Sequence, residues 1–300
     1  MTPEKGERQR EHDRMCSEIF PRFFGPARKA STISLRDWDR FIRERRSGKM
    51  RPANKRKASK VGERTIARDL KWLLAVLNWA TLAGDGHGGF LLDRNPLKGL
   101  TLPSEKNPKR PVCTEERYQS MLRVARDVDW RFELALILAH ETGHRCGAIR
   151  RLRWSDLDLV GGMVRWRSDT DKGGREHRTP LTPEAVEALE QAQQAHPAIG
   201  DAWVLPAPKD ASRPVSRHLV KSWWRRAETA AKLEHVEGMG WHSLRRKFVT
   251  ERKNAPLADL SALGGWKTPR TLVECYQQAD EATMREVLAT RRPLTAASGK

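Results

Sequence analysis

Between residues 65 and 82, the apolar residues recur with the spacing of one helix face. The series consists of Ile66, Leu70, Leu73, Leu74 and Leu77. The stretch GDGHGG at 84–89 then ends the pattern. Because this stretch follows no strand and lacks the Lys-Ser or Lys-Thr pair of a phosphate-binding loop, it predicts a turn rather than a nucleotide site.

A second group of helical patterns begins after residue 112. Thr114 is placed to cap a helix whose apolar face includes Met121. A second apolar helix runs through 132–139 and breaks at Thr142-Gly143, and a short helix through Ile149 and Leu152 is expected next.

Two short β-type segments, 163–167 and 178–181, flank a Gly-Gly turn at 173–174 and predict a hairpin. Helical patterns then return for the rest of the chain. Further helices are predicted over 183–195, 216–231, 243–252, 256–263, 270–278 and 281–290. The fold class is therefore mainly α with a small β-sheet or hairpin.

The charge balance narrows the function. The chain has 57 Lys and Arg against 38 Asp and Glu, a net charge of +19. Such an excess favours a polyanionic partner, of which nucleic acid is the commonest. No apolar run is long enough for a membrane span, and the charged N-terminus is unlike a secretory signal. The expectation is a cytoplasmic protein that does not act at a membrane.

The four cysteines are widely separated and form no CxxC pair. This spacing argues against a disulfide scaffold and against a zinc module, so no metal and no cofactor are expected. A stretch with four prolines at 95–111 predicts an extended linker, with a boundary near residue 108. The expected regions are a basic, largely solvated or mobile segment (1–30), a helical domain (31–105), a linker (106–112), a second domain (113–290) and a tail (291–300).

Four separated segments hold polar residues that a plain helical domain does not need. They are 141–159 with Arg145, 171–181 with Lys172, 241–251 with His242 and Arg245, and 263–278 with Trp266 and Tyr276. Guanidinium groups bind phosphate oxygens and keep their charge, and tyrosine can form a covalent phosphoester. A lysine can protonate a departing alkoxide, and a histidine can exchange protons. Together these groups indicate metal-free phosphoryl transfer through a tyrosyl intermediate.

In this order and spacing the segments resemble the tyrosine recombinases, the phage integrase family. The resemblance covers roughly residues 60–280 and lies in TGHRCGAIRRLRW, KGGREHRTPL, HSLR and LGGW, followed by a tyrosine. It implies catalytic roles for Arg145, Lys172, His242, Arg245, Trp266 and the nucleophile Tyr276. One departure is Ala148, which stands where family members often carry an acidic residue, and the trailing histidine near the nucleophile is also absent.

The resemblance further implies a two-domain clamp around double-stranded DNA. Residues 31–105 would form a SAM-like core-binding domain and 113–290 the catalytic domain. The enzyme would act as a homotetramer on two attachment sites, with accessory factors where a system needs them. The residues expected at DNA are Lys106, Lys109 and Arg110 in the linker, and Arg217, Lys221 and Arg225 on helix 216–231.

Two other functions remain open at this point. A type IB topoisomerase would use the same chemistry without strand exchange, and a DNA-binding protein with an inactive site would keep only the fold. A synapsis assay distinguishes a topoisomerase from a recombinase, and a Tyr276→Phe comparison distinguishes an inactive DNA-binding protein from an active enzyme.

Overall fold

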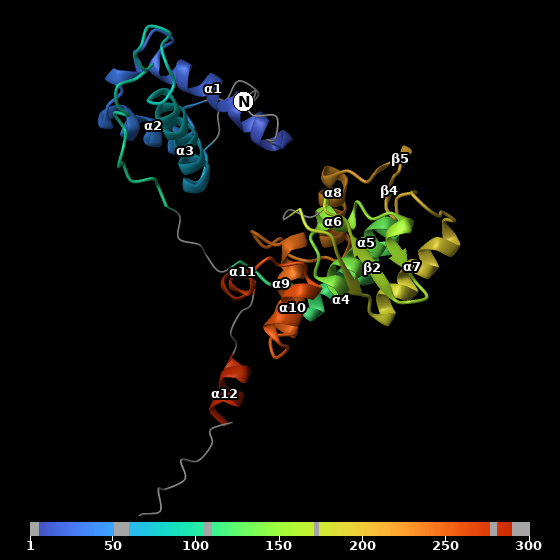
Figure 1. Cartoon of the computed structure of the whole chain (residues 1–300). Helices are drawn as coiled ribbons and strands as arrows, with labels where there is room; N and C mark the ends of the chain where they lie inside the picture. The colour runs from blue at the N-terminus through green and yellow to red at the C-terminus, as the bar shows by residue number, and fades with distance from the viewer. Residues whose placement is uncertain (1–5, 51–59, 105–109, 171–173, 277–280, 290–300) are drawn as a thin grey trace, which may run out of the picture. The chain divides into compact units, whose positions relative to one another are not determined.

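The computed structural model describes residues 6–50, 60–104, 110–170, 174–276 and 281–289. The chain divides into two compact units, residues 1–108 and 109–300, so the division falls within the proline-rich stretch 95–111 (Figure 1). In the described parts of the chain, no helix is both long and apolar enough to cross a membrane.

The first unit is built from helices. Its elements are α1 (Glu7–Phe24), the 3₁₀ turn η1 (Ala30–Thr32), α2 (Leu35–Ser47) and α3 (Glu63–Ala80). The buried face of α3 holds the predicted residues except Leu74, which is only partly buried, and it also holds Asp69, which the periodicity does not predict. The helix itself begins two residues before the predicted start at 65 and ends at Ala80.

The expectation of a solvated segment over residues 1–30 is wrong for α1. Cys16, Ile19 and Phe20 of α1 are buried in the core of the first unit, and the Phe20 ring stacks on Phe41 of α2 at 4.8 Å. The helix therefore belongs to the helical domain. Arg10, Arg14 and Arg22 of α1 are exposed, so their charges do not oppose this packing.

A buried polar group joins the three helices of this unit. Asp69 of α3 accepts two hydrogen bonds from Arg45 of α2 at 2.6 and 3.0 Å, and its other oxygen lies 3.1 Å from His12 Nε2. His12, Cys16 and Asp69 form a group of potential metal ligands, although the sequence spacing predicts none. Arg45 already neutralises the carboxylate, and burial raises the pKa of the Cys16 thiol to about 12.

The second unit packs its helices around α5 (Trp130–Thr142), which is buried on most sides. The helices near it are α4 (Glu115–Val128), α6 (Cys146–Ile149), α7 (Pro183–Ala195), α8 (Arg217–Ala230) and α9 (Trp241–Glu251). The chain continues through α10 (Leu257–Leu263), α11 (Pro269–Cys275) and α12 (Glu281–Ala289). Leu152, expected in a helix with Ile149, is buried beyond the end of α6.

The sheet confirms the predicted hairpin and extends it by one strand. The turn η2 (Trp154–Asp156) leads into β1 (Leu157–Asp158), which pairs antiparallel with β2 (Met163–Trp166), and β2 pairs antiparallel with β3 (His177–Pro180). The Trp166 indole donates to Thr179 Oγ1 at 2.9 Å, which fixes the register of β2 on β3. A second hairpin, β4 (Pro206–Ala207) with β5 (Asp210–Pro214), is not predicted from the sequence.

Candidate active site

The first arginine of the predicted site follows a turn that only glycine can make. Gly143 ends α5 in the left-handed region at φ 62°, and a Cβ there would lie 2.4 Å from the Phe248 ring. Arg145 then caps α6 with extended backbone, and its side chain is half-buried. The Thr142-Gly143 break therefore directs Arg145 away from the core helix.

Arg245 joins this turn to a second one. It lies on α9 with 1% of its surface exposed, and its Nη1 donates to the carbonyl oxygens of Gly143 and Gly264, the latter at 2.7 Å. The two carbonyls come from segments more than a hundred residues apart. One guanidinium thus fixes both turns while its charge stays in the site.

The second turn brings Trp266 onto the arginine. A Cβ on Gly264 would lie 1.7 Å from the Trp266 ring, so this close return of the chain requires glycine. Arg245 Cζ lies 3.5 Å from the centre of the Trp266 ring, a short cation–π contact. The buried indole Nε1 has no hydrogen-bond acceptor among the described residues, so it is a donor without a partner there.

Tyr276 completes this cluster. It is half-buried at the C-terminal end of α11, and its backbone N–H donates to the buried Leu272 at 3.0 Å. Its ring meets Trp266 edge to face, with 5.2 Å between centroids, and its centroid lies 5.3 Å from Arg245 Cζ. The predicted helix over 270–278 is shorter in the structure, so Tyr276 follows the helix.

His242 lies in the first turn of α9, ahead of Arg245. The helix begins earlier than predicted, and the two side chains differ in environment, since His242 is exposed and Arg245 is buried. Partial loss of hydration lowers the pKa of His242, and the charges of Arg245, Arg246 and Arg145 lower it further. The imidazole is therefore neutral near pH 7 and faces several guanidinium charges, an arrangement suited to an anionic ligand.

Of the remaining predicted residues, some lie outside the described residues, one adds its charge near His242, and three lie on α8. Lys172, Lys106 and Lys109 lie outside the described residues. The charge of Arg110 also lowers the pKa values of His242 and Arg246, so it contributes to the same positive region. The three predicted residues of α8, Arg217, Lys221 and Arg225, are all exposed on its outer face.

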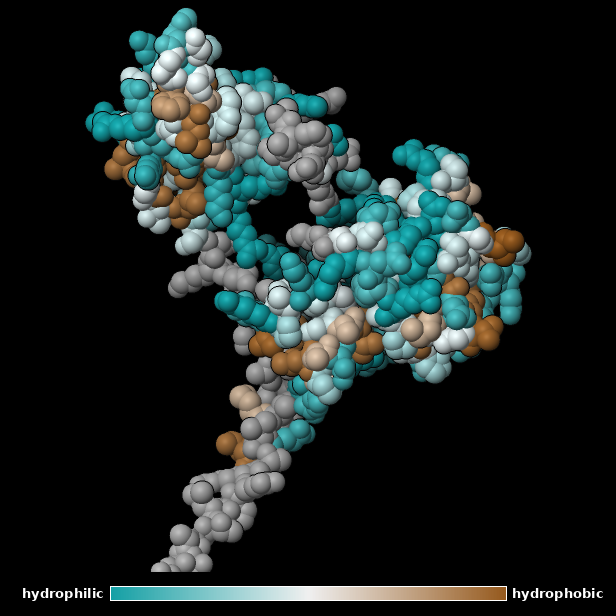
Figure 2. All heavy atoms as spheres, in the orientation of Figure 1, coloured by the Kyte–Doolittle hydropathy of each residue, from teal (hydrophilic) through white to brown (hydrophobic). Residues whose placement is uncertain are grey.

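Hydrophilic residues dominate the face of the second unit drawn in Figure 2, and the apolar residues there form separate small patches.

The inner face of α8 is apolar: Val220, Trp223, Trp224 and Ala227 are buried there. The helix is therefore amphipathic, and its basic residues point to solvent.

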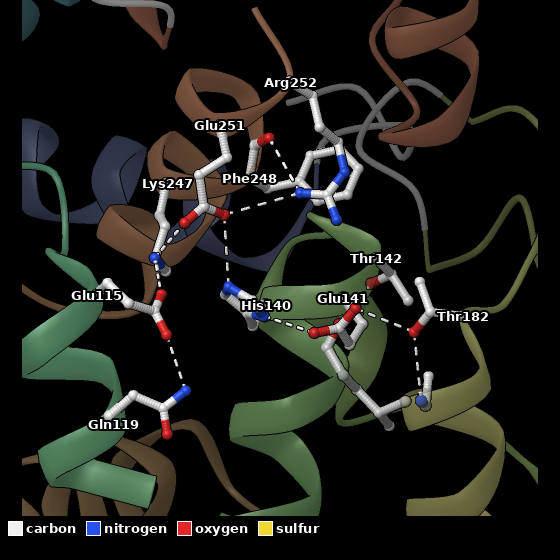
Figure 3. A network of polar contacts seen from close by, with 12 residues as sticks. Glu115, Gln119, His140, Glu141, Thr142, Thr182, Lys247, Phe248, Glu251 and Arg252 are labelled. Atoms are coloured by element: carbon white, nitrogen blue, oxygen red, sulfur yellow. Dashed lines mark hydrogen bonds and ion pairs between the residues drawn. The ribbon is translucent and has the colours of Figure 1, made fainter.

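A polar network that the sequence does not predict connects α9 to neighbouring helices (Figure 3). Lys247 is buried and forms ion pairs with Glu115 of α4 and Glu251 of α9. Together with His140, these carboxylates form a group of potential metal ligands. The Lys247 ammonium already pairs with both carboxylates and takes the place that a metal cation would need. The sequence signal for this network is the i, i+4 spacing of Lys247 and Glu251.

His140 carries the network into α5. Its Nδ1 lies 2.6 Å from the Glu141 carboxylate and its Nε2 lies 3.4 Å from Glu251. Glu141 also accepts a hydrogen bond of 3.0 Å from Thr182, the residue that caps α7. The helix that carries His242 and Arg245 is thereby tied to three other helices.

Because of this network, we expect the protein to be most stable at weakly acidic pH. Burial opposes the charge of His140, but Glu141 and Glu251 outweigh it and raise the His140 pKa above 6.5, so this contribution is lost as pH rises further. Burial also opposes the charges of Glu141 and Glu251, but their polar partners, His140 in both cases together with Lys247 at Glu251, outweigh it and lower their pKa values below 4.5, so that contribution is lost in acid. We expect stability to be highest between these limits and to fall at alkaline pH.

Urea unfolding followed by tryptophan fluorescence at several pH values would measure this dependence. In His140→Gln the alkaline decrease should disappear, whereas His87→Gln, which changes an exposed histidine in the first unit, should retain it. An unchanged decrease in His140→Gln would contradict the assignment to this network.

A family model and several solved structures match this chain. A model described as the phage integrase family matches residues 111–283. No sequence among the curated proteins matches the chain. The fold resembles residues 75–356 of lambda integrase, crystallised as a dimer bound to a COC′ core site, with a TM-score of 0.73 and 17% identity over 93% of each chain.

Two further structures are similar. The Tn1549 transposon integrase in complex with circular intermediate DNA gives a TM-score of 0.72 at 15% identity, over 97% of this chain and 95% of that one. The XerH recombinase bound to a palindromic difH substrate gives a TM-score of 0.71 at 15% identity, over 95% of this chain and 80% of that one. At these identities the likeness concerns the fold.

Proposed function

Because the chain belongs to the phage integrase family, we propose that it is a site-specific tyrosine recombinase. It would cleave and rejoin DNA through a 3′-phosphotyrosyl intermediate and so integrate or excise a mobile element. The observation that carries the proposal is the packing of Tyr276 against Arg245 and Trp266. This arrangement supports the proposal, because the ring of a tyrosine lies beside a buried guanidinium and beside an indole whose N–H has no acceptor among the described residues.

In the proposed reaction, the Tyr276 oxygen attacks the scissile phosphorus and the bond to the 5′-oxygen breaks. Lys172 gives a proton to the departing 5′-oxygen. Arg145 and Arg245 neutralise the phosphate, and the Trp266 N–H donates to one of its oxygens. A 5′-hydroxyl of the partner strand then attacks the phosphotyrosine and Tyr276 leaves, so the bond energy is conserved and neither ATP nor a metal is needed.

His242 has two uses in this scheme. The neutral imidazole, favoured by its lowered pKa, can accept the proton that Tyr276 loses on attack. Once protonated, the His242 imidazolium can also donate a hydrogen bond to a phosphate oxygen. Either use requires His242 to be accessible to substrate, and its side chain is exposed.

The partner proposed is double-stranded DNA at attachment sites, with a homotetramer assembled on two sites. Two proteins with the same fold have structures in complex with DNA, one of them as a dimer bound to a core site. The net charge of +19 supplies affinity for phosphates without sequence preference.

Covalent trapping tests the function. Duplexes from DNA flanking the gene, nicked near candidate crossover points, are incubated with the full chain without metal, and SDS gels show any adduct. We expect an adduct that peptide mapping assigns to Tyr276. Salt-sensitive binding without an adduct on any duplex would favour an inactive DNA-binding protein. Relaxation of supercoiled plasmid without recombinant product would favour a topoisomerase.

The outer face of α8 gives a separate prediction on DNA affinity. Changing Arg217, Lys221 and Arg225 together to Gln should make the slope of log K against log salt shallower by about 0.9 for each phosphate that is no longer neutralised. The control changes Arg123 and Arg126, which are exposed on α4, to Gln. Equal shifts per charge removed in the two variants, measured by fluorescence anisotropy, would show that general charge and not α8 is responsible.

A further inference from the structure

Two histidines meet beside the proposed active site, and the proposed mechanism uses neither. His144 stands between Gly143 and Arg145, and His177 is the first residue of β3. Their Nε2 atoms lie 3.1 Å apart. His144 is buried and its ring stacks on Trp166 of β2, with 3.6 Å between centroids and 8° between planes.

A third segment packs against the same pair. A Cβ on Gly265 would lie 2.9 Å from His177 Nε2 and 3.3 Å from His144 Nε2. Gly265 precedes Trp266 and has φ +65°, so a side chain there is disfavoured by both space and backbone. The two imidazoles therefore lie where the loop before Arg145, the start of β3 and the turn before Trp266 come together.

The surroundings fix the direction of the bond between the rings. His144 Nδ1 lies 3.1 Å from the Thr142 carbonyl oxygen, which can only accept, so Nδ1 carries a proton. Burial, followed by the charge of Arg245, holds the pKa of His144 well below its usual value, so the ring is neutral and its Nε2 is bare. The His177 Nε2–H therefore donates and His144 Nε2 accepts.

We propose that His144 and His177 are positioning residues, whose hydrogen bond holds the Arg145 loop and the Trp266 turn against β3 in the geometry that binds phosphate. This inference rests on the proposed function, because it concerns the same site. Removal of the donor leaves the buried Nε2 of His144 without a partner in a packed environment. Arg245 still joins the two segments through the carbonyl oxygens of Gly143 and Gly264, but the segments are then no longer held against β3.

Single-turnover adduct formation on nicked attachment DNA tests this inference. His177→Phe keeps a ring but removes the donor, and we expect it to slow adduct formation by about ten- to a hundredfold with DNA Kd changed less than about twofold. His177→Gln returns an N–H near the position of Nε2 and should recover most of the rate. His87→Phe, an exposed control in the first unit, should behave as wild type.

The outcomes separate this inference from the proposed function. Wild type that forms no adduct overturns both. An active wild type with a fully active His177→Phe, or with Phe and Gln variants equally slow, overturns the positioning role alone. Nitrogen-15 NMR of the histidine rings in the full chain supplies a readout besides activity. We expect neutral His144 protonated at Nδ1, and a proton on its Nε2 would overturn the inference.

Discussion

Tyr276→Phe is expected to lose covalent DNA capture while DNA affinity stays within about twofold of wild type. The change removes one hydroxyl, so the rate of adduct formation should fall by at least about a thousandfold. The phenylalanine ring keeps the edge-to-face contact with Trp266 and the contact with Arg245, so the site stays packed. SDS gels measure the adduct and anisotropy measures the affinity.

The chain itself offers the matched control. It has two tyrosines, and Tyr118 is buried on α4, where its ring stacks on His140 at 4.1 Å. Burial raises the pKa of the Tyr118 hydroxyl, so this group is a poor nucleophile. Tyr118→Phe should therefore form the adduct at the wild-type rate. An adduct that survives Tyr276→Phe but not Tyr118→Phe would reverse the assignment of the nucleophile.

The predictability of the fold from the sequence differs between the two units. In the second unit, apolar patterns and clear caps give the start of α4, the break that ends α5 and both ends of α7, because burial and capping act within each segment. In the first unit, α1 escapes prediction because its few apolar residues stand among many charges and Pro21 interrupts the pattern. Its helical state depends on packing against α3, which no local pattern encodes.

The candidate site is likewise only partly predictable from the sequence. The order of the segments points to Arg145, Arg245, Trp266 and Tyr276, but not to the reason for the glycines between them. Arg245 needs the carbonyl of Gly143 from one segment and that of Gly264 from another, a relation visible only in three dimensions. The contacts of the Lys247 network with Glu115 and His140 and the His144–His177 pair are likewise long-range, and only the i, i+4 spacing of Lys247 and Glu251 is visible within one element.

The double hydrogen bonding of Arg245 leads to the second large prediction. Arg245→Lys keeps the charge, but a single ammonium cannot lie flat on Trp266 while it donates to both carbonyls. We expect adduct formation to fall by about a hundredfold or more, with the salt dependence of DNA binding nearly unchanged because the charge remains. Single-turnover trapping and salt titration measure the two effects.

The neighbouring residue provides the comparison for this prediction. Arg246 is also buried, and its Nη1 donates to the carbonyl oxygen of Pro111 at 2.7 Å. A lysine can make a single bond of this kind, so Arg246→Lys should slow adduct formation by less than about tenfold. Equal decreases in the two variants would mean that the site needs buried arginines in general. A much larger decrease in Arg245→Lys would instead trace the effect to the one guanidinium that fixes both turns and stacks on Trp266.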